Sequence, residues 1–361
     1  MMTIPLKELM EMAIQKNASD IHLKYNNPPI LRIDGVLKRI DEEHILSDED
    51  LKVYLHELAS PTDVSKYEKV FEIDISFYFE NKARFRVNIC RDDGHIRIVM
   101  RLIPLKVLTI DELNLPTILK KLCKLKNGLI LITGPTGSGK STTLAAMIDE
   151  INNTRSDHVI TIEDPLEFVH RDKQCIITQR EIGHDTLSFA NALRAALRQD
   201  PDVILIGEMR DTETVRTALS SAETGHLVLS TLHTVDAVET LNRIIEFFEP
   251  HQHLFVRKQL ASVLRGVISQ RIVPMASGIG RCVAAEILIG TRAVRDFIEQ
   301  GKPFRDIVSL IQEGKDQYGM QTFDQALFDL WSQKRISTET ALSYATSPKD
   351  LKLRMQGLSV H

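Results

Sequence analysis

The sequence predicts an α/β protein with two domains, a small α+β domain over residues 1–105 and a larger one over residues 106–361. In the second domain, short apolar runs alternate with helical patterns, which is typical of parallel strands joined by helical crossovers. A glycine-rich loop lies between one of those apolar runs and the next helical pattern. The first domain instead has strand-like runs joined by short turns, which favours an antiparallel sheet.

The composition is that of a water-soluble globular protein, with 43% hydrophobic and 26% charged residues among 361. The net charge of -4 gives no electrostatic reason to expect direct binding of nucleic acid or of an anionic membrane. The four cysteines form no C-x-x-C pair, which argues against a zinc site and suits a reducing cytoplasm. No apolar run approaches the roughly 20 residues of a membrane span, so any membrane role would come through a partner.

The first domain begins with a helical pattern near residues 6–16, followed by strand-like runs at 20–23 and 30–33. Asp34-Gly35 predicts a hairpin turn after the second run. A helix near 48–59 follows, and then strand-like runs at 71–79, 83–90 and 95–102.

The second domain contains four apolar runs that we interpret as buried parallel strands, at residues 129–133, 159–162, 203–206 and 227–230. The helical patterns between these runs should cover both faces of the sheet. After Pro250 the chain is mostly helical, with a hairpin expected over residues 271–288 and a helical region from about residue 290.

The glycine-rich loop fits the pattern G-x-x-x-x-G-K-[ST] and lies between a predicted strand and a predicted helix, where a phosphate-binding loop is expected. Its glycines let successive N–H groups point at a phosphate, and the helix N-terminus adds positive potential. Lys140 would contact the β- and γ-phosphates, and the Ser141 hydroxyl would bind Mg²⁺. The loop therefore predicts binding of ATP with Mg²⁺, through Gly134, Pro135, Thr136, Gly137, Ser138, Gly139, Lys140, Ser141 and Thr142. The competing interpretation is a glycine-rich turn that binds nothing.

Acidic residues follow two of the predicted strands. Glu163 and Asp164 end the run at 159–162, and Glu208 stands just after the run at 203–206. The carboxyl ends of parallel strands form the edge at which ligands bind, so both glutamates are candidate catalytic residues. We favour Glu163 as the base that activates water and Glu208 as a metal ligand, although the sequence leaves the two roles interchangeable. Asp164 alone could equally cap a turn.

His233 ends the fourth predicted strand at the same sheet edge. There it could hydrogen-bond a γ-phosphate and respond to hydrolysis. A lone histidine is more often structural, but its position favours the functional interpretation.

Arginines of the first domain gather on adjacent predicted strands, at Arg84, Arg86, Arg97 and Arg101. They could form a solvated sheet face, or act as arginine fingers that reach a nucleotide on a neighbouring subunit. Arg194 and Arg198, four residues apart in the second domain, could act likewise.

Two further segments make the set of sequence motifs specific to one family. Residues 163–168 read Glu-Asp-Pro-Leu-Glu-Phe and resemble the Asp box of secretion ATPases, while residues 224–234 resemble their His box. Together with the phosphate-binding loop, the acidic strand ending at Glu208, the Ser-Asp-Ile-His-Leu run at 19–23 and the segment at 318–327, they resemble PilT-type type IV pilus retraction ATPases almost from end to end.

This resemblance implies a PAS-like N-terminal domain, a RecA-like ATPase domain, and a homo-hexamer that binds ATP between the two. It also implies a cytoplasmic motor at the inner-membrane face that depolymerises pilin through a platform protein and supports twitching motility. The stretch 293–300 corresponds to the family motif AIRNLIRE, and Arg295 is kept whereas Glu299 replaces the second arginine. That reversal leaves open a PilU-like accessory ATPase, or an ATP-binding modulator of a paralogous retraction motor. A nucleic-acid motor is a more distant alternative, because the chain has no Lys/Arg-rich stretch.

Overall fold

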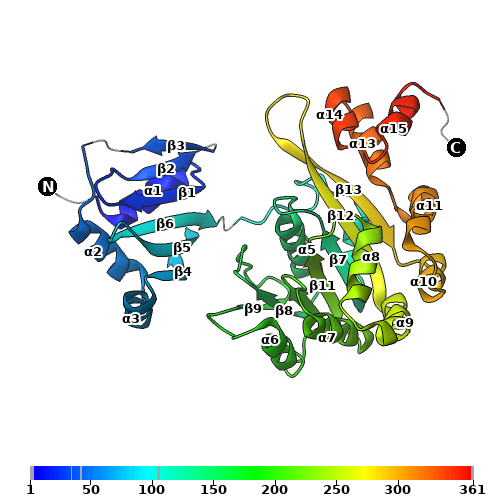
Figure 1. Ribbon diagram of the computed structural model, residues 1–361, viewed down its shortest axis with the longest axis horizontal. Coiled ribbons are helices and arrows are strands. Elements are labelled where there is room, and N and C mark those ends of the chain that lie inside the picture. Colours follow the sequence, from blue (N-terminus) through cyan, green and yellow to red (C-terminus); the bar gives the residue numbers. More distant parts are fainter. Residues whose placement is uncertain (1–3, 34, 41–42, 81, 104–105, 359–361) are drawn as a thin grey trace. The chain divides into compact units, whose positions relative to one another are not determined.

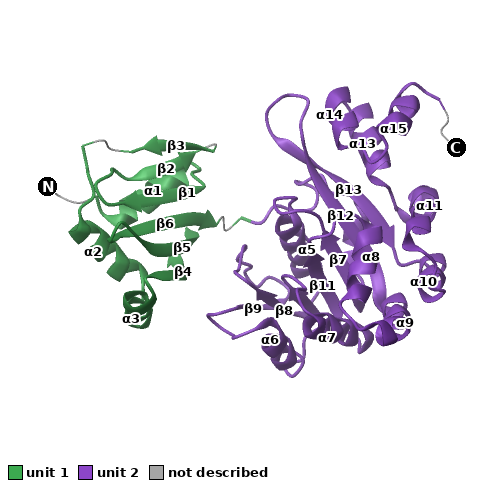
Figure 2. Cartoon of the chain, in the orientation of Figure 1, with its two compact units in different colours: residues 1–106 green, residues 107–361 purple. Residues whose placement is uncertain are grey.

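The computed structural model describes residues 4–33, 35–40, 43–80, 82–103 and 106–358, which form two compact units, residues 1–106 and 107–361 (Figures 1 and 2). Asp34 of the predicted turn and residues 104–105, where we expected the domain boundary, lie outside the described residues.

Unit 1 is a six-stranded antiparallel sheet in the order β3-β2-β1-β6-β5-β4. Its elements are α1 (Leu6–Gln15), β1 (Asp20–Lys24), β2 (Ile30–Ile33), β3 (Val36–Arg39), α2 (Asp48–Leu58), α3 (Pro61–Val70), β4 (Glu72–Phe79), β5 (Ala83–Asp92) and β6 (His95–Ile103). We did not predict α3, which buries only Val64 and Tyr67 and so has a weak apolar pattern. Its start is nevertheless marked by Ser60, whose side chain accepts the Asp63 N–H, and by Pro61 in the first turn.

Unit 2 is built on a seven-stranded sheet in the order β13-β12-β7-β11-β10-β8-β9 (Figure 1). The strands are β7 (Gly128–Thr133), β8 (His158–Glu163), β9 (Ile176–Glu181), β10 (Val203–Ile206), β11 (Leu227–Leu232), β12 (Leu264–Pro274) and β13 (Arg281–Ile289). All neighbours are parallel except β13, which pairs antiparallel with β12. The predicted hairpin is therefore present, but it begins earlier in the chain and extends the parallel sheet beside β7.

Helices cover both faces of this sheet, as the alternation of apolar runs and helical patterns predicted. In β7, Leu129 and Leu131 join one hydrophobic cluster while Ile130 and Ile132 join the other, because successive side chains of a strand point to opposite faces. The first cluster includes α6 (Phe189–Ala196), α7 (Thr212–Glu223), α8 (Ala237–Glu246), α9 (His253–Val263), α10 (Arg292–Glu299) and α11 (Ile307–Glu313). The second includes α4 (Ile118–Cys123) and α5 (Lys140–Thr154).

The chain ends in short helices, as expected from about residue 290, comprising α10, α11, α12 (Lys315–Tyr318), α13 (Phe323–Ser332), α14 (Thr338–Tyr344) and α15 (Pro348–Met355). Residues of α13, α14 and α15 form a separate hydrophobic cluster with Val273, Cys282 and Ala284 of the β12–β13 hairpin. The end of the chain is thereby packed on the two strands that lie beside β7.

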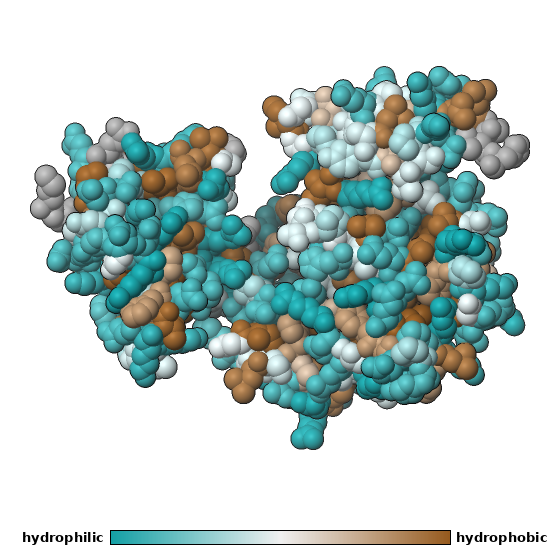
Figure 3. Space-filling view, viewed as in Figure 1, coloured by the Kyte–Doolittle hydropathy of each residue, from teal (hydrophilic) through white to brown (hydrophobic). Residues whose placement is uncertain are grey.

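The visible face of each unit is mostly hydrophilic with scattered hydrophobic residues (Figure 3). Over the described residues, no helix has the length and apolar character needed to cross a bilayer.

Candidate active site

The phosphate-binding loop leaves the carboxyl end of buried strand β7 and leads directly into α5. Gly139 precedes the helix with a positive φ of 88°, and no side chain caps the helix N-terminus. The first N–H groups of α5 therefore remain available for an anion, and the helix dipole adds to their attraction.

Gly134 is required by the close approach of the loop to strand β12. Its φ is 140°, and a Cβ atom there would lie 2.5 Å from Ser138 Oγ and 2.6 Å from the carbonyl oxygen of Gln270. Ser138 Oγ is itself buried without a hydrogen-bond partner within the described structure. A bound phosphate would offer acceptors to such unpaired donors of the loop.

Lys140 is largely buried, and its Nζ donates to the carbonyl oxygens of Gly134 at 2.8 Å and Pro135 at 3.1 Å. The same Nζ lies 3.4 Å from His233 Nδ1. Burial lowers the pKa of Lys140, and the charges of Glu208 and Glu167 act in the opposite direction. The ammonium is thus partly desolvated and held where a triphosphate would meet it.

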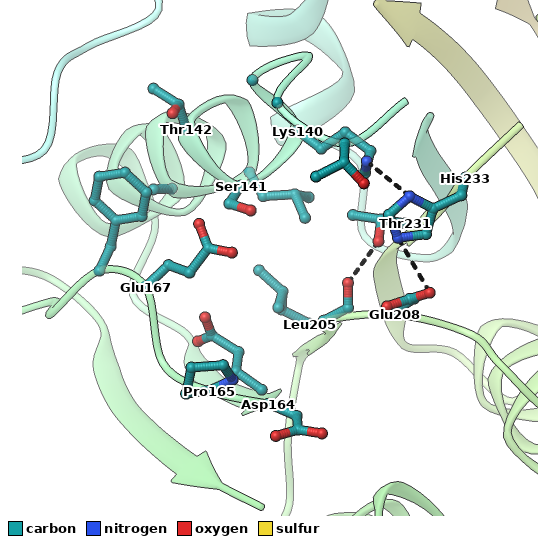
Figure 4. A pocket seen from close by; sticks show the side chains of 18 of the residues that line it. Lys140, Ser141, Thr142, Asp164, Pro165, Glu167, Leu205, Glu208, Thr231 and His233 are labelled. Carbon is teal, nitrogen blue, oxygen red and sulfur yellow. Dashed lines mark hydrogen bonds and ion pairs between the residues drawn. The ribbon is translucent and has the colours of Figure 1, made fainter. Parts of the chain in front are cut away.

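Glu208 has cationic or polar partners on two sides. His233 Nε2 lies 3.2 Å from Glu208 Oε1, and the Arg210 guanidinium donates to Glu208 Oε2 at 2.8 Å. Arg210 also lies 3.9 Å from an oxygen of Asp164. Lys140, His233 and Glu208 therefore form one continuous line of contacts across the ends of β11 and β10 (Figure 4).

Glu163 stands in a different environment. Thr161 Oγ1 donates to its Oε1 at 2.7 Å. Desolvation raises the pKa of Glu163 to about 7, although hydrogen bonds from Thr161, the Glu167 backbone and Gln179 act against that rise. A carboxylate with a pKa near neutrality can both accept and release a proton, which is the property of a general base.

One cavity of about 390 Å³ is lined by Lys140, Ser141, Glu163, Glu208 and His233. Figure 4 shows this cavity with Lys140, Ser141, Glu208 and His233 around it. The Ser141 hydroxyl and the Glu208 carboxylate are oxygen donors of the kind that Mg²⁺ prefers. In protein sites, Mg²⁺ usually keeps waters and substrate phosphates as its other ligands. The described residues contain no group of three or more His, Cys, Asp or Glu side chains arranged for a metal. The loop, the free helix N-terminus and these donors fit a magnesium nucleotide.

The structure places the predicted arginines of unit 1 on one sheet face, since Arg86 pairs in register with Arg101 and Cys90 with Arg97. Arg86, Arg97 and Arg101 are exposed to solvent at 44%, 42% and 68% of their side chains. Arg84 is only 1% exposed, donates to Ser76 Oγ at 2.6 Å and lies over the Tyr78 ring. Burial of its guanidinium counts against Arg84 as a finger and assigns it to the interior of unit 1.

Arg194 and Arg198, which we expected to lie one turn apart on a helix, do not both lie in a helix. Arg194 lies in α6 and pairs with Glu213, whereas Arg198 lies two residues beyond the end of α6. Both are exposed, and neither is among the described residues that line the cavity. Any role at a nucleotide would therefore require a site other than the cavity of their own chain.

Sequence reasoning missed several residues around the cavity. Arg210 comes two positions after Glu208, and that spacing alone could have suggested an ion pair between them. Ile272 and Arg281 also line the cavity, because the β12–β13 hairpin lies beside β7. No local sequence pattern predicts that Ile272 and Arg281 lie at the cavity, because their position depends on a pairing between strands more than 130 residues apart.

A phosphate-binding loop on a RecA-like parallel sheet, with two glutamates and a histidine around the same cavity, defines a P-loop ATPase. The chain belongs to the family described as type II/IV secretion system protein, whose model matches residues 2–304. It is similar to the type IV pilus retractation ATPase PilT of Pseudomonas aeruginosa, with 44% identity over 96% of this chain and 99% of that protein.

Two further comparisons agree with this membership. The type IV pilus ATPase PilU of Pseudomonas aeruginosa is 38% identical over 97% of this chain and 91% of its own length. A crystal structure of the pilus retraction motor PilT with bound ADP matches with a TM-score of 0.90 and 44% identity, covering 97% of this chain and 99% of that one.

Proposed function

We propose that this chain hydrolyses ATP with Mg²⁺ to drive retraction of a type IV pilus. The proposal of ATP hydrolysis rests on the line of contacts from Lys140 through His233 to Glu208. These contacts join the phosphate-binding loop to an acidic residue. The choice of pilus retraction rests on similarity over almost the whole chain to a protein named as a pilus retraction ATPase.

In this mechanism, the loop N–H groups and Lys140 would bind the phosphates, and Ser141 and Glu208 would hold the metal. Mg²⁺, when bound, would neutralise charge that develops on the phosphate oxygens. Glu163 accepts the proton of the attacking water, for which its pKa of about 7 suits it near neutral pH. His233, between Lys140 and Glu208, is placed to hydrogen-bond the γ-phosphate and to change partners once that phosphate leaves.

The proposal includes a homo-hexamer in which Arg86, Arg97 and Arg101 of unit 1 complete a nucleotide site. A guanidinium added to the transferring phosphate stabilises its charge and accelerates hydrolysis. The ring would act at the cytoplasmic face of the inner membrane through a platform protein, without direct contact with nucleic acid.

An accessory role beside a paralogous retraction ATPase is the second candidate, and Glu299 favours it. Glu299 lies at the exposed end of α10, four residues after Arg295, where the family motif has an arginine. The reversed charge would alter contacts of this surface with a partner without touching the nucleotide cavity.

The test of hydrolysis is Glu208→Gln in the full-length chain. Loss of the carboxylate removes a metal ligand and the partner of His233, so we expect turnover to fall by at least about 100-fold with folding retained. Glu249→Gln, at an exposed position outside the cavity, is the matched control. Near-normal hydrolysis by Glu208→Gln would contradict the assignment.

Scoring pilus retraction after gene deletion, with and without a paralogue, separates a motor from an accessory subunit.

A further inference from the structure

A chain of buried hydroxyl groups lies behind the nucleotide cavity and has no part in the mechanism above. Thr133 Oγ1 lies 2.8 Å from Ser269 Oγ and 3.4 Å from Thr240 Oγ1, and Thr240 Oγ1 lies 2.7 Å from Thr234 Oγ1. Ser269, Thr133 and Thr240 are 0% exposed and Thr234 is 3% exposed. Four hydroxyls therefore lie in sequence in the buried interior.

Two members of this chain, Thr133 and Thr234, adjoin the two segments that flank the proposed γ-phosphate position. Thr133 is the last residue of β7 and immediately precedes Gly134, the first residue of the phosphate-binding loop. Thr234 immediately follows His233. Ser269 lies opposite Thr133 in the parallel pairing of β12 with β7, and its hydroxyl is the second partner of Thr133 Oγ1.

Thr240 is the branch point of the chain. Its Oγ1 also lies 2.6 Å from the carbonyl oxygen of Asp236, the N-cap residue of α8. A hydroxyl has one proton to donate and two lone pairs to accept with, so Thr240 can donate to Asp236 or to Thr133, but not to both. Thr234 can then donate to Thr240 in either case. The same atom thus ties the loop after His233 to α8 and to the strand that carries the phosphate-binding loop.

We propose that Thr240, through Thr133 and Thr234, is a positioning residue that sets the place of His233 relative to the phosphate-binding loop. This inference rests on the proposed role of His233 at the γ-phosphate. His233 is itself exposed, at 46% of its side chain, so its imidazole is not held by packing. Anchoring the next residue by a buried hydroxyl limits how far the imidazole can move from Lys140 and Glu208.

The test compares Thr240→Val with Thr240→Ser in the full-length chain, using kcat and KM for ATP. Valine keeps the shape and removes the hydroxyl, whereas serine keeps it. We expect Thr240→Val to lower kcat about tenfold with KM changed less than about twofold, since small misplacements of a catalytic group reduce the rate of the chemical step. Thr240→Ser should retain most of the wild-type kcat.

A double variant shows whether the effect passes through His233. If it does, adding Thr240→Val to His233→Ala will not lower kcat further, whereas independent effects would multiply. The matched control is Ser221→Ala, which removes another buried helix hydroxyl that donates to the carbonyl four residues earlier, and it should keep wild-type kcat. Should Thr240→Val fail to fold, Thr234→Val breaks the same chain at the end next to His233 and carries the same expectations.

Wild-type kcat in Thr240→Val, equal losses in the presence and absence of His233, or no rescue by serine would each overturn the inference. An unchanged kcat in His233→Ala would overturn it as well. A wild-type chain without ATPase activity would instead contradict the proposed function.

Discussion

At the scale of single residues, the two glutamates of the cavity differ in what surrounds them. Glu208 faces Arg210 and His233, which stabilise a carboxylate by direct contact. Glu163 accepts a hydrogen bond from the Thr161 hydroxyl at 2.7 Å, and desolvation raises its pKa to about 7. Similar side chains at neighbouring strand ends are therefore suited to different tasks, a charged ligand and a proton acceptor.

This difference predicts a pH dependence for hydrolysis. A base must be deprotonated to act, so kcat/KM for ATP should rise with pH and reach half its maximum near pH 7, the pKa of Glu163. Steady-state rates from pH 6 to 8.5 measure this. Glu163→Gln should remove the rise together with most of the activity, and a flat wild-type profile would rule out Glu163 as the base.

A second buried glutamate should affect stability rather than catalysis. Glu286 is 7% exposed and accepts the Ala237 N–H at 2.9 Å, and burial raises its pKa from 4.5 to about 7. The folded state then binds the proton more tightly than the unfolded state. Its contribution is fully present below pH 4.5 and is lost as pH rises through about 7.

Glu286→Gln keeps an acceptor for Ala237 and removes the titration. We therefore expect the variant to be more stable than the wild type at pH 8, by on the order of 2 kcal/mol, with little difference at pH 5. Denaturant unfolding at both pH values measures this. An unchanged pH dependence in the variant would show that Glu286 does not contribute to it.

At the scale of elements, the phosphate-binding loop is shaped by the neighbouring strand as much as by its own glycines. Gly134 faces the Gln270 carbonyl oxygen of β12, whereas a Cβ at Gly137 would meet no atom within 4 Å. Both have positive φ, so a side chain is strained at either position, but only Gly134 also lacks space.

The comparison of Gly134→Ala with Gly137→Ala tests this contact. Overpacking a buried site costs about 1–3 kcal/mol, so Gly134→Ala should weaken ATP binding about tenfold or more and lower the melting temperature. Gly137→Ala should cause a smaller loss of ATP affinity and a smaller drop in melting temperature. Equal losses in the two variants would mean that backbone conformation, rather than the contact with β12, decides the effect.

The sequence predicted the elements whose signals are local. The runs that became β7, β8, β10 and β11 are buried over at least four successive residues and are mostly apolar, as burial on both faces requires. Strand β9 reads Ile-Ile-Thr-Gln-Arg-Glu at a sheet edge and carries too little apolar signal. The contact between Thr133 and Thr240 joins residues 107 positions apart, so no pattern in the sequence could reveal it.

At the scale of the whole molecule, the function proposed here requires one subunit to complete the site of another. Asp20, which is 5% exposed, accepts from Arg101 Nε at 3.0 Å and lies 3.6 Å from Arg32 Nε. This buried carboxylate holds Arg101 against its strand while 68% of the arginine side chain stays exposed. Arg101 is therefore held through its Nε, while most of its side chain stays exposed to a partner.

Mixing two inactive variants tests that arrangement. Lys140→Ala lacks a working nucleotide site but keeps Arg101, and Arg101→Ala has the reverse defect. If the arginine acts on a neighbour in a ring, each variant alone should be nearly inactive, whereas an equal mixture should regain about a quarter of wild-type activity by random assembly. A mixture with no more activity than its parts would place Arg101 in its own subunit's site or in none.

The position of β7 has a consequence for synthesis of the chain on the ribosome. Its neighbours in the sheet are β11 and β12, which end at Leu232 and Pro274, about 100 and 140 residues later. Until those segments have left the exit tunnel, the strand that bears Gly134 has an unpaired edge on each side and the nucleotide cavity does not exist. ATP can therefore stabilise the nascent chain only after β12 has left the tunnel, and the apolar strands made before that point depend on chaperones or on early local packing to stay soluble.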